Sequence, residues 1–364
     1  MGGVAWGAPT EAGCVAAADY SAGLAGRALL VMHEGKVVFE RYDNGFDGAR
    51  AHPLASGSKS FVGVLAAAAV EDGIIPGFDD TVSGTIKEWG EAEGKKDITV
   101  RQLLSLSSGL DPSDALLGGR GGGRVLGDGA DARQRRLGGA DRPPQPDDNF
   151  SAALGVPMKG KPGMQFEYGP AHFYAFGAYL EARLAATKTE QQRYRAYFDA
   201  RIATPLGMNV AWWGKDKTGN PDTPGGMLMT AGEWAKFGEF VRLGGAVRQG
   251  DGSLKQIVRK DLIEELMKPS ATNSSYGMTW WLPGGDGEIG VADGDMRQRI
   301  LRQQMGPIKD PQGKPVRVWM AAGLGKQRLL VLPDHGVVIV RFAEAARAGM
   351  AYQDGELVKR VMGW

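Results

Sequence analysis

The sequence is poor in the residue types that hold metals and disulfides. Its one cysteine excludes an internal disulfide and a cysteine-based zinc site, and its four histidines lie far apart in the chain. No H-E-x-x-H pattern occurs, so we expect neither a metal nor another cofactor. The charge is nearly balanced, with 43 Lys and Arg against 42 Asp and Glu, which argues against nucleic acid as the main partner.

Long apolar runs are missing as well. No stretch approaches the roughly 20 residues of a membrane helix, so no membrane span is expected. The first twenty residues carry neither the basic start nor the apolar core of a signal peptide. Either the protein is cytoplasmic, or Met1 begins a trimmed chain whose full form is periplasmic or secreted. The compartment and the oligomeric state stay open.

Glycine, in contrast, is abundant. Its 56 residues are about twice the usual share of roughly 7%, which indicates many turns and close backbone approaches rather than a helical bundle. Hydrophobic residues make up 43% of the chain and charged residues 23%, so a sizeable core is expected. The length of 364 residues predicts one large or two medium domains.

Strand patterns lie at both ends of the chain. Residues 27–43 predict a β-hairpin with alternating apolar positions. Three more strand-like runs follow late in the sequence, over residues 316–325, 327–333 and 336–342, and residues 355–364 have helical spacing. We therefore predict an α+β fold in which the N- and C-terminal segments form one antiparallel sheet flanked by helices.

The middle of the chain has mostly helical patterns. Residues 58–73 are almost wholly apolar and predict a buried helix closed by a glycine, with a shorter helix over residues 98–110. Residues 171–203 read as a long amphipathic stretch with a break near Thr187, and Thr230 opens a capping box for a helix through Leu243.

These patterns divide the chain into two parts. We expect a discontinuous sheet domain of residues 1–58 and 275–364, and a mostly helical region of residues 59–274. Residues 118–149 are dominated by Gly, Arg, Asp and Pro, and predict a loop or flap over a site. Its six arginines also suggest a phosphate or nucleic-acid contact, but the interspersed aspartates and the lack of a G-K-[ST] pattern argue against one.

The chemically informative feature is Ser56-Gly57-Ser58-Lys59, at the entrance to the apolar helix. Serine needs a neighbouring base to become a nucleophile, and residues three apart share one face of a helix. Burial and the positive end of the helix dipole both disfavour the ammonium form of Lys59, which suits a base. The backbone N–H of Ser56, at the start of the helix, is available to an oxyanion. This S-x-x-K arrangement is typical of serine acyl-transfer enzymes.

A purely structural interpretation of the same motif competes with this catalytic one. Ser56 could simply cap the helix while the lysine reaches water along it. The context favours chemistry, because a lysine is unusual at the start of a deeply apolar helix. No G-x-S-x-G pattern occurs, so the nucleophile elbow of an α/β-hydrolase is absent.

The chain resembles the serine β-lactamase and penicillin-binding-protein superfamily, in its class C β-lactamase-like branch of carboxylesterases, D-amino-acid peptidases and nylon-oligomer hydrolases. The matching stretches run in family order and are ALLVMHEGKVVFERYDNG, PLASGSKSFVGVLAAAAVEDG, DITVRQLLSLSSGLD, GKPGMQFEYGPAHFYAFGAYLE, GGMLMTAGEWAKFGEF, SSYGMTWWLP and AAGLGKQRLLVLPDHGVVIV. The resemblance implies that Ser56 is acylated and that Lys59 is its base partner.

The family's second motif, a tyrosine usually written Y-x-N, has two candidates. Tyr42-Asp43-Asn44 fits the letters but ends a strand before the nucleophile. Tyr168-Gly169-Pro170 follows PGMQFE and precedes an apolar helix, which is the family's context. By the resemblance, Tyr168 relays protons to the leaving group. His172, close to it in sequence, is expected to be a buried structural histidine.

The third motif, commonly K-T-G or H-x-G on a strand, also has two candidates. A literal Lys217-Thr218-Gly219 lies in a loop context, whereas Ala321-Ala322-Gly323 ends a strand as in the family. By the resemblance, the N–H of Leu324 is then the second oxyanion donor. Without Lys or His there, and with Pro170 in place of the asparagine, a β-lactam substrate is disfavoured.

The sequence thus predicts a serine hydrolase that acts on a small-molecule ester or amide through an acyl-enzyme, with a carboxylesterase as the leading interpretation. A β-lactamase, a D-amino-acid peptidase or amidase, and an acyltransferase remain open. A non-catalytic binding protein on the same scaffold is the alternative from another class. It is disfavoured, because a binding protein has no chemical need for Ser56, Lys59 and Tyr168 together.

Overall fold

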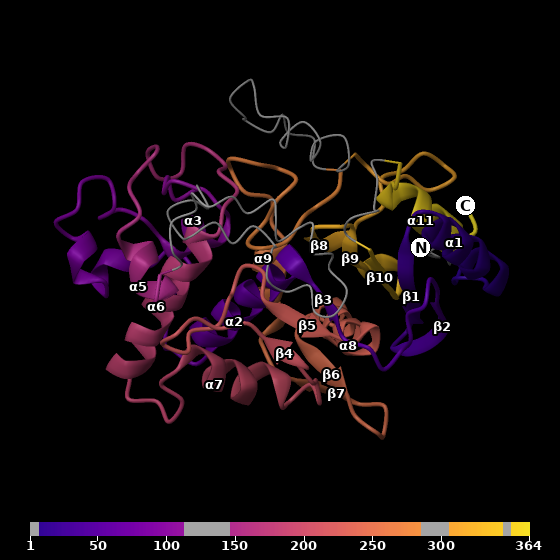
Figure 1. The fold of residues 1–364 in the computed structure, drawn as a ribbon, viewed down its shortest axis with the longest axis horizontal. Coiled ribbons are helices and arrows are strands. Elements are labelled where there is room, and N and C mark those ends of the chain that lie inside the picture. The colour runs from indigo at the N-terminus through magenta and orange to yellow at the C-terminus, as the bar shows by residue number, and fades with distance from the viewer. Residues whose placement is uncertain (1–6, 113–145, 285–305, 345–350) are drawn as a thin grey trace, which may run out of the picture.

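The structure, a computed structural model, describes residues 7–112, 146–284, 306–344 and 351–364. At its centre is a five-stranded antiparallel sheet in the order β2-β1-β10-β9-β8. The strands are β1 Gly26–His33, β2 Lys36–Tyr42, β8 Trp319–Gly323, β9 Gln327–Leu332 and β10 Val337–Ala343. The predicted α+β fold, with a sheet formed from both ends of the chain, is confirmed (Figure 1).

The sheet joins the two ends of the chain through β1. This strand pairs with β2 on one side and with β10 on the other, where Leu30 lies opposite Val340. The hairpin between β1 and β2 turns at Glu34 and Gly35, whose φ angles of 50° and 80° are the positive values that a two-residue hairpin loop requires. The predicted hairpin is therefore present, with β2 as the exposed edge strand.

Helices cover both faces of this sheet. On one face, α1 (Glu11–Gly23) and α11 (Asp354–Met362) pack against each other, so the two ends of the chain lie side by side (Figure 1). On the other face, α8 (Ala231–Arg242) contacts β1, β9 and β10. The helix α1 was not predicted from the sequence.

The apolar helix predicted over residues 58–73 is α2 (Lys59–Glu71), buried along most of its length. It is preceded by a 3-10 turn, η1 (Ala55–Ser58). Phe61 of α2 stacks on Phe237 of α8 with ring centroids 3.8 Å apart. The helix α8 therefore lies between the sheet and α2, and the start of α2 is directed toward the β8 edge of the sheet, where β8 contacts η1.

The remaining helices lie mostly in the middle of the chain, as predicted. The break expected near Thr187 is the end of α6, and Thr230 caps α8 by accepting the N–H of Glu233. The carboxylate of Glu233 accepts the N–H of Asn209 instead of completing the capping box. The helices are α3 Val100–Leu104, α5 Asn149–Leu154, α6 Ala171–Ala186, α7 Tyr194–Phe198 and α9 Lys260–Leu266, with short turns η2 Val82–Gly84, η3 Lys87–Trp89, η5 Asp199–Ala203 and η6 Pro333–His335.

Two small sheets were not predicted. One has the order β3-β5-β4 and the other pairs β6 with β7. Their strands are β3 His52–Pro53, β4 Trp212–Trp213, β5 Met227–Met229, β6 Ala246–Arg248 and β7 Leu254–Gln256. The division of the chain into two domains stays a prediction, and the loop expected over residues 118–149 lies, except for its last four residues, outside the described part of the chain.

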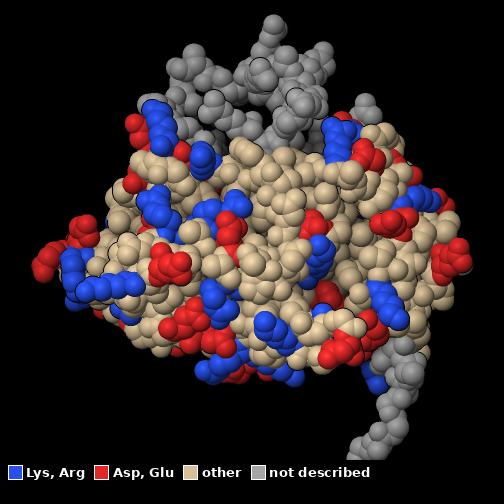
Figure 2. Space-filling view, turned by 90° about the horizontal axis from the view of Figure 1, so that it is seen from below, with Lys and Arg blue, Asp and Glu red and all other residues tan. Residues whose placement is uncertain are grey.

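The surface carries charges of both signs. On the face shown in Figure 2, basic and acidic side chains are interspersed, in keeping with the net charge of +1. Among the helices of the described residues, none is long and apolar enough to cross a membrane.

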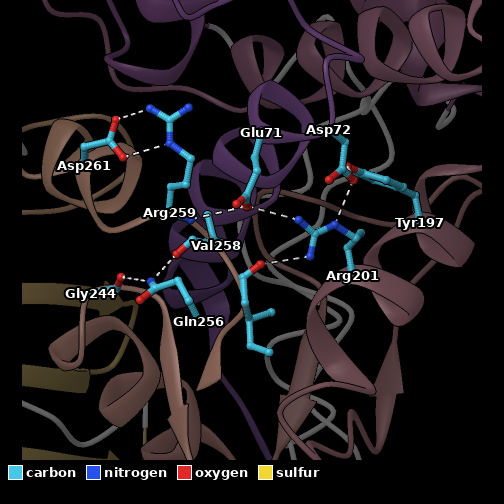
Figure 3. Close-up of polar contacts among 10 residues, drawn as sticks. Glu71, Asp72, Tyr197, Arg201, Gly244, Gln256, Val258, Arg259 and Asp261 are labelled. Carbon is cyan, nitrogen blue, oxygen red and sulfur yellow. Dashed lines mark hydrogen bonds and ion pairs between the residues drawn. The ribbon is translucent and has the colours of Figure 1, made fainter. Parts of the chain in front are cut away.

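The far end of α2 is held by an arginine from a neighbouring element (Figure 3). Arg201 of η5 donates hydrogen bonds to Asp72 at 2.7 Å, to Glu71 at 3.1 Å and to the carbonyl of Ile257 at 3.0 Å. Tyr197 donates to the same Asp72 carboxylate at 2.7 Å. One guanidinium thus joins the end of α2 to η5 and to the segment before α9.

We predict that Arg201→Met lowers the free energy of unfolding by roughly 1–3 kcal/mol, because three charge-assisted contacts are lost while the side chain is only a quarter exposed. The matched control is Arg259→Met, whose pairing with Asp261 is solvent-exposed and is expected to contribute much less. Urea unfolding of both variants measures the difference. Equal losses would contradict the role given to Arg201.

Candidate active site

Ser56 lies in a strained turn. Ala55, directly before it, has a φ of 48°, a left-handed conformation that costs a non-glycine residue free energy and persists where surrounding contacts enforce it. Ser58 supplies such contacts, because its hydroxyl donates to the Ala55 carbonyl at 2.8 Å and accepts the N–H of Met227 at 3.2 Å. The turn places Ser56 in the first turn of the helical segment, where backbone N–H groups have no partner within the helix.

Lys59 is the first residue of α2 and only 6% exposed. Its Nζ lies 3.0 Å from Ser56 Oγ and 2.7 Å from the carbonyl oxygen of Pro224. Two aromatic rings also lie next to Nζ, with the ring centroid of Tyr168 at 5.1 Å and that of Phe173 at 5.4 Å. The lysine therefore points at the serine. It does not reach out to water, which is what the purely structural interpretation of the motif would require.

The unpredicted β3-β5-β4 sheet explains how Pro224 reaches this lysine. The strand β3 ends just before η1, and β5 begins just after the turn of residues 222–226. Leu54 donates its N–H to the carbonyl of Met227 at 2.9 Å, which continues the pairing of these strands. The entrance to the serine turn and the Pro224 turn are thus neighbouring ends of paired strands.

Tyr168 lies beside Lys59, half-buried, and stacks on Trp281 with ring centroids 5.9 Å apart. Trp281 exchanges two backbone hydrogen bonds with Met320 of β8, so the tyrosine is tied to the edge of the main sheet. The carbonyl of Leu106, itself in a left-handed conformation with a φ of 60°, accepts the N–H of Glu167 at 2.7 Å and holds the segment that leads to Tyr168.

His172 is fully buried behind Tyr168 and has structural partners on both ring nitrogens. Its Nδ1 pairs with the hydroxyl of Ser108 at 2.9 Å and its Nε2 with the carbonyl of Glu167 at 2.8 Å. Burial, together with the nearby Lys59 charge, lowers the pKa of His172 to about 4. A neutral imidazole with Nε2–H as donor therefore fixes the residue before Tyr168, in line with the structural role expected for it.

The strand β8 carries Ala321, Ala322 and Gly323 and lies against η1. A Cβ atom at Gly323 would stand 2.0 Å from the carbonyl oxygen of Leu54, so the close approach of β8 to the serine turn needs glycine. Leu324 follows directly, with its side chain 65% exposed. Gln327 donates to the carbonyl of Leu324 at 3.2 Å and to that of Ala343 at 2.8 Å, which holds this turn on the sheet.

The competing motif candidates lie elsewhere. Tyr42 ends β2, at the opposite edge of the five-stranded sheet from β8, and donates to Glu40. Lys217 lies in an exposed turn, where it pairs with Asp147 at 2.6 Å. The structure thus brings Ser56, Lys59 and Tyr168 together near β8, whereas Tyr42 lies at the opposite edge of the sheet and Lys217 is an exposed residue paired with Asp147.

Two groups near the site could not be found from the sequence. The acceptor on Lys59 is a backbone carbonyl, which no side-chain pattern reveals. Of the tryptophans in the sequence pairs Trp212-Trp213 and Trp280-Trp281, Trp281 is in ring contact with Tyr168, while Trp212 is half-exposed on β4. Within the described residues, no three His, Cys, Asp or Glu side chains are grouped as a metal site would need.

Comparisons with known proteins agree with the geometry. The family model described as Beta-lactamase matches residues 12–359. Similar solved structures include "Putative 6-aminohexanoate-dimer hydrolase from Bacillus anthracis", with 19% identity, a TM-score of 0.66, and coverage of 94% of this chain and 79% of that one. A D-stereospecific amidohydrolase from Streptomyces sp. has 16% identity, a TM-score of 0.63, and coverage of 96% and 98%.

A third similar structure is EstCE1, described as a hydrolase with promiscuous acyltransferase activity. It has 15% identity and a TM-score of 0.59, and 96% of each chain is covered. At these identities the solved structures show the fold alone. No curated protein matches the chain. The resemblance inferred from the sequence motifs is confirmed.

We predict that Gly323→Ala lowers the free energy of unfolding by about 1–3 kcal/mol, because the added methyl group meets the backbone of Leu54 and β8 has to move. The control is Gly232→Ala in α8, where a Cβ meets no atom within 4 Å and alanine favours the helix by up to about 1 kcal/mol. Thermal unfolding separates the two variants. Equal stability of Gly323→Ala and wild type would mean that the approach is looser than described.

A second prediction concerns pH. Because the pKa of His172 is lowered to about 4 by burial, the unfolded chain binds a proton between pH 6.5 and 4 that the folded chain does not. Stability therefore falls as the pH falls through this window. In urea unfolding measured from pH 7 to 4.5, the variant His172→Gln should show a shallower slope of unfolding free energy against pH, smaller by the contribution of about one proton. His52, with a pKa also lowered to about 4, still contributes to the slope in both proteins. An unchanged slope would contradict the prediction.

Proposed function

Because the chain belongs to the β-lactamase family, whose members are serine hydrolases, we propose that it hydrolyses small-molecule carboxylic esters through an acyl-enzyme on Ser56. The observation that carries the proposal is the buried contact of Lys59 Nζ with Ser56 Oγ, at 3.0 Å, in a strained turn. Serine becomes a nucleophile when a base within hydrogen-bond reach takes its proton, and Lys59 stands at that distance.

In the proposed acylation, Ser56 Oγ attacks the ester carbonyl carbon and passes its proton to Lys59. The N–H groups of Ser56 and Leu324 stabilise the oxyanion. The bond to the alkoxy group then breaks, and the alcohol leaves with the proton, relayed through Tyr168. Water attacks the acyl-enzyme, gives one proton back to Ser56 through the same groups and releases the acid, so the net reaction consumes one ester and one water.

The preference for an ester rests on departures from the family's motifs. Ala321 and Ala322 offer no cation where relatives carry Lys or His to bind a β-lactam carboxylate, and Pro170 replaces the amide of the second motif. An ester needs less help for its leaving group than an amide does. Amide hydrolysis, which the names of two similar structures indicate for those proteins, is the second candidate.

We predict that wild type hydrolyses p-nitrophenyl esters from acetate to octanoate and that Ser56→Ala lowers kcat/KM by about a thousandfold or more. Labelling by a fluorophosphonate, located by mass spectrometry, should occur on Ser56 because an activated serine reacts and a helix cap does not. The matched control is Ser60→Ala, which removes another buried serine hydroxyl of α2, bound to the carbonyl of Thr279, and should leave labelling intact.

The outcomes separate the alternatives. Labelling of Ser56 without ester hydrolysis, but with turnover of D-amino-acid amides or of nitrocefin, would replace the ester with an amide or β-lactam substrate. Absence of labelling and of every hydrolysis would overturn the enzyme proposal in favour of a binding protein.

A further inference from the structure

A buried hydrogen bond connects the helix after Tyr168 with the turn that holds Lys59. Tyr174, in the first turns of α6, donates its hydroxyl to Oδ1 of Asp222 at 2.7 Å. The tyrosine is 2% exposed and the aspartate 6%. The mechanism proposed above uses neither residue. Burying a carboxylate to this degree costs free energy unless polar partners compensate it.

Asp222 anchors the turn of residues 222–226. Its carbonyl accepts the N–H of Gly226 at 2.9 Å and the indole N–H of Trp213 at 3.0 Å, and its own N–H donates to Gly214 at 2.6 Å. A Cβ at Gly226 would stand 2.6 Å from the Cβ of Asp222, so the turn is closed tightly on this residue. The backbone of Asp222 thus closes the turn, and its side chain joins that turn to Tyr174 of α6.

Pro224 is two residues further along the chain, and its carbonyl oxygen accepts a hydrogen bond from Lys59 Nζ at 2.7 Å. That carbonyl is the second oxygen in contact with Nζ, besides Ser56 Oγ at 3.0 Å. A hydrogen bond of this length restricts where the Nζ atom can lie.

We propose that Tyr174 and Asp222 are positioning residues for Lys59, which fix the Pro224 carbonyl so that the lysine is aimed at Ser56. This inference rests on the proposed function of Ser56. The helix α6 then contacts Lys59 in two ways, directly through the ring of Phe173, which packs against the Nζ atom, and indirectly through Tyr174.

The ionisable groups near Lys59, among the residues that the structure describes, come from several elements. Tyr168 lies on the segment before α6, His172 on α6 itself and Asp222 on the turn before β5. His172 remains neutral above pH 5, since its pKa is about 4.

The test is the variant Tyr174→Phe, with Tyr179→Phe as the matched control. Tyr179 also lies on α6, is also buried and also donates to a carboxylate, that of Asp80 at 2.5 Å. Asp80 lies in the loop before η2, so this control loses the same kind of bond without touching the Pro224 turn. The readouts are the pH–rate profile of fluorophosphonate labelling of Ser56 and kcat and KM for the best p-nitrophenyl ester.

Loosening the Pro224 carbonyl removes one of the two oxygen contacts that hold Lys59 Nζ in place beside Ser56. In Tyr174→Phe we therefore expect the plateau labelling rate and kcat to fall about tenfold, with KM within about twofold of wild type. Tyr179→Phe should keep the wild-type profile at a similar loss of thermal stability.

A third variant separates position from charge. Asp222→Asn keeps an oxygen that can accept a hydrogen bond from the Tyr174 hydroxyl, so this variant should retain more of the plateau labelling rate than Tyr174→Phe does. If Tyr174→Phe shows the same profile and plateau as Tyr179→Phe while wild type is labelled, the positioning role is wrong and the proposed function stands. If wild type itself is not labelled at Ser56, the proposed function has failed instead.

Discussion

The site depends on one buried lysine side chain. Lys59 is the first residue of an apolar helix, and its Nζ atom has two oxygen contacts, Ser56 Oγ at 3.0 Å and the Pro224 carbonyl at 2.7 Å. A polar group removed from water is stable only where polar partners replace the lost hydration. The surrounding structure holds those two oxygens, one on a side chain and one on the backbone, within hydrogen-bond distance of the lysine.

Each oxygen is held by a different part of the fold. The serine turn is strained at Ala55 and is closed against β8 by the absence of a side chain at Gly323, so the main sheet fixes the nucleophile side. The Pro224 turn is fixed by the small β3-β5-β4 sheet and by a hydrogen bond from α6. The same helix follows Tyr168, which brings the third proposed catalytic group into the same frame.

Much of this was predictable because the signals are local. The strands at both ends of the chain have alternating or continuous apolar patterns, and residues 58–73 are too apolar to be anything but buried. The spacing of Ser56 and Lys59 implies a shared helix face without any tertiary information. In contrast, α1 has too weak an apolar periodicity to be noticed, and strands as short as His52–Pro53 carry no pattern at all.

The sequence by itself placed a serine and a lysine one helical turn apart at the start of an apolar segment, which favours a nucleophilic serine over a simple helix cap. Tertiary structure decided which tyrosine lies beside Lys59, because Tyr168 contacts its Nζ atom while Tyr42 ends the strand at the opposite edge of the sheet. It also placed Ala321, Ala322 and Gly323 of β8 against the serine turn. It also supplied the Pro224 carbonyl, a partner without a side-chain signature, whose position depends on the pairing of His52 with Met229 and of Pro53 with Leu228, residues far apart in the sequence.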